Sequence, residues 1–96
     1  MRYEIKARMW LYPGEAAWHF ITLPKELSRR IKRFAGGSLS PFGSLRVVAT
    51  IGATSWKTSI FPSEAGAFLL PVKAMVRKKE AIKAGDRVKL ALELDL

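Results

Sequence analysis

Residues 66–95 read GAFLLPVKAMVRKKEAIKAGDRVKLALELD and decide the fold class of this 96-residue chain. Residues 67–76 are almost all apolar and predict a strand. Pro71 lies inside that strand and has no N–H to donate to a β-ladder, so it favours an edge, a bulge or a break at that point.

The rest of the stretch predicts a short helical turn followed by a closing strand. Residues 77–83 form the helical turn, which Gly85 ends. Residues 87–95 alternate apolar and charged side chains, and this period of two indicates a strand with one buried face. The stretch is therefore expected to run strand, helical turn, strand.

The N-terminal part predicts a β-hairpin. Residues 2–12 alternate between an apolar face and a charged face, as a half-buried strand does. Pro13-Gly14 then supplies a tight turn. Residues 16–22 are expected to return as the antiparallel partner.

A helix is predicted to begin at Pro24, where the missing N–H costs nothing. Leu27, Ile31 and Phe34 follow at helical spacing and form its apolar stripe. Gly36-Gly37 is expected to end the helix, with one glycine in the left-handed conformation.

The middle of the chain predicts a second hairpin, in which Gly52 separates residues 45–51 from residues 55–61. With the other segments this makes about six strands, one α-helix and one helical turn. Short strands joined by tight turns indicate a mainly-β single domain, 1–96, that forms a small barrel or sandwich.

Several short motifs follow one another along nearly the whole chain: Trp18-x-Phe20-x-x-Leu23-Pro24, Gly52-x-x-x-Trp56, Thr58-Ser59, Phe61-Pro62 with Gly66, Leu70-Pro71-Val72, Arg77-Lys78, Gly85-Asp86-x-Val88 and Asp95. In this order and spacing they resemble the bacterial and archaeal family catalogued as domain of unknown function 1905. The resemblance implies a double-split antiparallel β-barrel with a helix lying against it. It implies no catalytic residues and no cofactor.

Composition narrows the function classes. The formal net charge of +9, from 17 basic and 8 acidic residues, makes polyanions plausible partners. With no cysteine and one histidine, thiolate metal sites and cysteine nucleophiles are excluded, and no metal site is expected. Charges interrupt the N-terminal segment and no apolar run is long enough to span a bilayer, so we expect a cytoplasmic protein with no membrane partner.

Two basic clusters are the candidate anion-binding residues. The first lies on the predicted helix and comprises Lys25, Arg29, Arg30, Lys32 and Arg33. The second lies near the last turn and comprises Arg77, Lys78, Lys79 and Lys83. Like charges at i, i+3 and i+4 repel along a helix, and the tolerance of that repulsion favours an anionic partner.

The aromatic residues and the histidine form a second candidate group. Trp18 and Trp56 lie on predicted strands and are expected to fill the core. Trp10 and Tyr12 are aromatic side chains on the otherwise polar face of their strand. They are expected to pack at the end of the barrel, or to mark a contact surface if exposed. His19, between Trp18 and Phe20, is expected to be structural or solvated.

Three hypotheses for function follow. The first is a non-enzymatic β-barrel module that binds a polyanion, nucleic acid first, through phosphate contacts without base-specific readout. The second is a small-molecule-binding barrel or an enzyme, with Trp18, His19 or Trp56 at the mouth of a cavity. The third is an oligomeric or protein-binding module that uses Trp10, Tyr12 and the strand interrupted by Pro71. No cofactor is expected.

Overall fold

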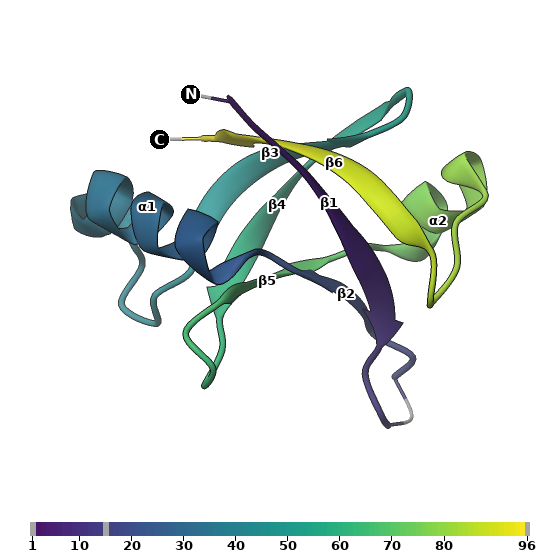
Figure 1. The fold of residues 1–96 in the computed structure, drawn as a ribbon, viewed down its shortest axis with the longest axis horizontal. Coiled ribbons are helices and arrows are strands. Elements are labelled where there is room, and N and C mark those ends of the chain that lie inside the picture. The colour runs from purple at the N-terminus through teal and green to yellow at the C-terminus, as the bar shows by residue number, and fades with distance from the viewer. Residues whose placement is uncertain (1, 15, 96) are drawn as a thin grey trace.

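The computed structural model describes residues 2–14 and 16–95, and its six strands close into one antiparallel barrel (Figure 1). The strands are β1 (Arg2–Leu11), β2 (His19–Thr22), β3 (Leu45–Ile51), β4 (Thr54–Pro62), β5 (Phe68–Pro71) and β6 (Arg87–Leu94). Two α-helices, α1 (Lys25–Ala35) and α2 (Ala74–Glu80), and a 3₁₀ turn at Gly36–Ser38 complete the fold. The predicted fold class is therefore confirmed.

The barrel is split because its two longest strands each change partner along their length. β1 pairs with β6 over residues 2–8 and with β2 over residues 9–11. β4 pairs with β3 over residues 54–60 and with β5 only at residues 61–62. The strand order β1-β2-β5-β4-β3-β6 thus closes with two splits, as the resemblance implied.

Inward-facing side chains of the strands form one core, which α1 completes. On β3 the alternate residues Leu45, Val47, Ala49 and Ile51 are buried, as in a strand with one face on the core. From α1, Leu27 and Ile31 join the same core, and the burial of such a side chain contributes about 1.5–3 kcal/mol.

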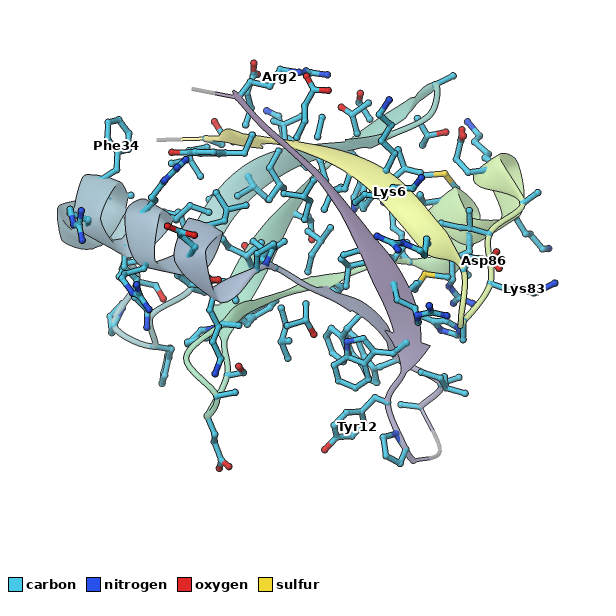
Figure 2. All side chains as sticks on the ribbon, viewed as in Figure 1. Arg2, Lys6, Tyr12, Phe34, Lys83 and Asp86 are labelled. Carbon is cyan, nitrogen blue, oxygen red and sulfur yellow. The ribbon has the colours of Figure 1, made fainter. Side chains whose placement is uncertain are left out.

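The buried stripe of α1 is rotated from the predicted one. Phe34 was expected to face the core, but it is 54% exposed and projects from α1 away from the strands (Figure 2). Ser28 and Ala35 are buried instead. The hydroxyl of Ser28 accepts a hydrogen bond of 2.9 Å from the N–H of Phe68, and this bond turns the Ser28 side of the helix toward β5.

The predicted end of α1 is also wrong in one respect. Gly36 has φ −53° and ψ −36°, so it continues in a right-handed conformation into the 3₁₀ turn. Neither Gly36 nor Gly37 has a positive φ. The chain therefore leaves the helix by tightening its last turn, without a left-handed glycine.

The boundary between β5 and α2 lies earlier than predicted. The strand ends at Pro71, which matches a strand break there, and α2 covers residues 74–80, not 77–83. The helix stops because Ala81 adopts the left-handed conformation, with φ 53°, and its N–H is directed to the carbonyls of Arg77 and Lys78. Gly85 instead donates its N–H to the carbonyl of Met9 (2.8 Å) at the approach to β6.

The N-terminal hairpin has a longer connection than predicted. β1 ends at Leu11, and β2 begins only at His19, not at residue 16. The N–H of Tyr12 donates to the carbonyl of Trp18 (2.8 Å), which closes the connection between the two strands. Residues 16–18 therefore lie outside the strand ladder.

A hydrogen bond attaches α2 to the hairpin between β3 and β4. The hydroxyl of Thr54 donates to Oε2 of Glu80 (2.6 Å). The same carboxylate lies against Gly52, which has φ 58°, so closely that a Cβ at this position would overlap it. Gly52 is required here both for its left-handed backbone and for its lack of a side chain.

Ser28→Ala is expected to lower the free energy of unfolding by about 1–3 kcal/mol, because the buried N–H of Phe68 loses its acceptor. Urea unfolding followed by circular dichroism measures this loss. Ser38→Ala is the matched control, since Ser38 is exposed in the 3₁₀ turn. A Ser28→Ala effect no larger than that of the control would contradict the assigned role of this bond.

Gly52→Ala is expected to destabilise the fold more than Gly66→Ala does. Both glycines have a positive φ, but a Cβ at Gly66 meets nothing within 4 Å. Gly66→Ala therefore reports the backbone cost alone, about 1–2 kcal/mol, and the excess for Gly52→Ala reports the contact with Glu80. Chemical unfolding of both variants, with Glu80→Ala added to Gly52→Ala, checks this. Equal losses for the two glycines would show that the carboxylate moves aside freely.

Candidate anion-binding cleft

The two predicted basic clusters lie at opposite ends of the barrel. The α1 cluster comprises Lys25, Arg29, Arg30, Lys32 and Arg33, and all five side chains are exposed. The α2 cluster comprises Arg77, Lys78, Lys79 and Lys83 on and after α2. The strands separate the two helices (Figure 1), so these clusters form two surfaces and not one.

A third group of cations lies on the outer face of the barrel. In this group, which we name the β1–β6 ladder, Lys6 is directly opposite Lys89 and Arg8 is directly opposite Arg87. All four residues are exposed. Like charges opposite each other on adjacent strands are destabilising. Positive charge is thus spread over several faces, and charge alone does not select a binding site.

One basic surface is also concave. A cleft of about 650 Å³ lies beside β4, where that strand has separated from β5. Its walls come from the residues before β2, from β3 and β4, from the end of β5 and from the start of α2. The cleft is therefore a direct product of the split between β4 and β5.

The backbone of β4 presents an open edge to the cleft. A two-residue loop, Gly52-Ala53, joins β3 to β4, and the residues on either side of it, Ile51 and Thr54, face each other. In a hairpin with a two-residue loop, these two residues form a hydrogen-bonded pair. Hydrogen-bonded pairs alternate along an antiparallel ladder, so Lys57 and Ser59 direct their N–H and C=O groups away from β3. Both line the cleft, where β5 does not pair with them.

Four cationic side chains line the cleft: Arg46, Lys57, Lys73 and Arg77. Among the described residues of the lining, none is acidic. Such a gathering of one sign of charge in a concave surface raises the local concentration of anions. Only Arg77 belonged to a predicted cluster. The other three come from β3, β4 and the segment before α2, and no local sequence signal connects them.

Arg77 is held in a defined orientation. Its Nε donates to the carbonyl of Val72 (3.2 Å), and its Nη1 lies 3.5 Å from Nε2 of His19. Nδ1 of His19 lies 2.8 Å from the carbonyl oxygen of Ala17. Because that oxygen can only accept, Nδ1 carries the hydrogen of the neutral ring and Nε2 accepts from Arg77. These contacts engage Nε and Nη1 of Arg77, which also lines the cleft.

His19 itself is half-buried and lines the cleft. Ala17, whose carbonyl holds it, has φ 50°, a left-handed conformation that is uncommon for alanine. Such a backbone persists when surrounding contacts require it. The positive φ of Ala17, the ring of His19 and the guanidinium of Arg77 thus form one connected arrangement on the cleft wall.

The three tryptophans occupy different environments. Trp56 is 7% exposed and fills the core, as predicted. Trp18 is 53% exposed, so the prediction that it fills the core is wrong. The physical reason is that β2 begins at His19 and not at residue 16, which leaves Trp18 outside the ladder. Trp10 is half-buried and its Nε1–H donates to the hydroxyl of Thr22 (2.9 Å), while Tyr12 is exposed.

The arrangement offers the chemistry of anion recognition. Guanidinium and ammonium groups line the same cleft as the hydroxyls of Thr58 and Ser59, and Trp18 and Phe61 add aromatic surface there. Within residues 2–14 and 16–95, no three His, Asp or Glu side chains are grouped to hold a metal ion. No helix in this part of the chain is long and apolar enough to cross a membrane.

Comparison with known proteins identifies a family. No curated protein matches the chain. The family model described as "Domain of unknown function (DUF1905)" matches residues 6–92, a range that includes both helices, the cleft and most of every strand. As the resemblance in its motifs predicted, this chain belongs to the family described as domain of unknown function (DUF1905).

Proposed function

We propose that this protein is a non-enzymatic module that binds a polyanion, nucleic acid first, and that the cleft beside β4 holds the phosphates. One observation carries the proposal: Arg46, Lys57, Lys73 and Arg77 converge from separate elements on one concave surface. Arginine and lysine bound to phosphates release condensed counterions, which is the main source of affinity in sequence-independent binding. Such a partner would be met in the cytoplasm, where we place the protein.

The proposal changes the site that the sequence predicted. Of the predicted basic residues, Arg77 is in the cleft, whereas the α1 cluster lies at the far end of the barrel (Figure 1). Lys78 and Lys79 share the helix of Arg77 and strengthen the positive potential at that end. If each of the four cleft cations contacts one phosphate, log K should fall with log salt with a slope of about −3 for a single strand.

A second candidate is a small anionic molecule held in the same cleft. The cleft volume of about 650 Å³ lies within the range of small-ligand sites. The half-buried His19 and the oriented guanidinium of Arg77 would give such a ligand fixed partners. Affinity that does not increase from a mononucleotide to an oligonucleotide would favour this candidate.

The triple variant Arg46→Gln, Lys57→Gln and Lys73→Gln is expected to weaken binding of a labelled oligonucleotide roughly 10- to 100-fold and to reduce the salt slope by about 2. All three side chains are exposed, so the fold should be retained. Fluorescence polarisation across a salt series of roughly 50 to 200 mM measures both quantities.

The matched control is Lys25→Gln, Arg29→Gln and Arg33→Gln, which removes the same number of exposed charges from the α1 cluster. This control should lose little affinity. Equal losses in both triple variants would mean that net charge, and not the cleft, attracts the ligand. No binding by the unsubstituted protein at the lowest salt would refute the polyanion proposal itself.

A further inference from the structure

Trp18 is an exposed aromatic side chain with a rigid support. Its ring lies nearly parallel to that of Phe20, with an interplanar angle of 8° and centroids 6.0 Å apart. Phe20 in turn packs on Trp10 at 5.3 Å, and the Nε1–H of Trp10 is bonded to the hydroxyl of Thr22. The indole of Trp18 is thus supported by a series of contacts fixed on β1 and β2, while about half of its surface, 53%, meets solvent.

Trp18 lies at the border between two different surfaces. On one side it lines the cleft with His19 and Arg77. On the other side it lines an apolar hollow of about 330 Å³, whose other walls are Tyr12, Phe20, Phe61 and Leu69. Figure 2 shows Tyr12 projecting from the end of β1 at the edge of the molecule. Phe61 also lines both surfaces, so the cationic cleft and the exposed aromatic rings adjoin each other at Trp18 and Phe61.

We infer that the polyanion is single-stranded nucleic acid, whose phosphates lie in the cleft while an unpaired base stacks on Trp18. This inference rests on the proposed function and adds a base-dependent contact to it. A single strand exposes both phosphates and base faces, and stacking on aromatic side chains is how proteins hold such strands without sequence preference. A duplex hides its base faces in the stack, and other polyanions have no bases. Either kind of ligand should therefore contact the cleft without stacking on Trp18.

The composition of the chain excludes one form of base-specific readout. The chain contains no asparagine and no glutamine, the side chains that read adenine by paired hydrogen bonds. Every base has a face that can stack, so Trp18 would accept any of them. We therefore expect similar affinities for homopolymers of different bases, apart from the ordinary differences in stacking strength.

The test compares Trp18→Ala with the unsubstituted protein on three labelled probes: a single strand, an abasic strand of equal length, and a duplex. Trp18→Ala should weaken binding of the single strand about 5- to 150-fold, the range for the loss of one stacked base. It should change the affinity for the abasic strand and for the duplex by no more than about twofold. Trp18→Phe should retain most of the affinity, because a ring that can stack is still present.

The matched control is Phe42→Ala, which removes an aromatic side chain that is 89% exposed and does not line the cleft. Loss of affinity for all three probes alike in Trp18→Ala, or for none, would overturn the inference. If the unsubstituted protein binds the abasic strand as tightly as the single strand, the polyanion proposal stands and the stacking inference fails. If no probe binds at low salt, the proposed polyanion binding is refuted, and the stacking inference is refuted with it.

Discussion

The cleft depends on one constraint of strand pairing: β5 is too short to cover the second edge of β4. β3 covers one edge from residue 54 to residue 60, but β5 is four residues long and reaches β4 only at residues 61–62. A proline ends β5, and it cannot donate to a further ladder bond. The remaining edge of β4 is left open, and its backbone groups, with Lys57 beside them, face the cleft.

α2 converts this open edge into a walled site because two of its side chains attach it to the barrel. At the middle of the helix, Arg77 is bonded to the carbonyl of Val72 and contacts His19 on β2. At its last residue, Glu80 accepts from Thr54 at the start of β4. The helix therefore spans the distance between β2 and the β3–β4 hairpin. These two attachments hold Arg77 beside the cleft through side chains, and the N–H of Val72, which donates to the carbonyl of His19 (2.9 Å), holds the segment that carries Lys73.

Sequence patterns were sufficient where burial repeats along one segment. Residues 87–95 alternate as a half-buried strand does, and the structure confirms a strand over Arg87–Leu94. The start of α2 was misplaced because Ala74, Met75 and Val76 continue the apolar run of the strand before them, so that periodicity could not separate the two elements. The cleft was not predictable from any segment. Arg46, Lys57 and Lys73 are isolated cations until the barrel closes, and the exposure of Trp18 depends on where β2 begins.

The β1–β6 ladder has a consequence for how ionic strength acts on this protein. Lys6 faces Lys89 and Arg8 faces Arg87 across the contact that joins the first and last strands. Added salt screens this repulsion and so favours the closed barrel, whereas the same salt weakens any phosphate contact in the cleft. Fold stability and partner affinity thus respond to salt with opposite signs. In dilute salt the isolated barrel is least stable to unfolding. Under the same condition a bound polyanion stabilises it most, because phosphate contacts are then strongest.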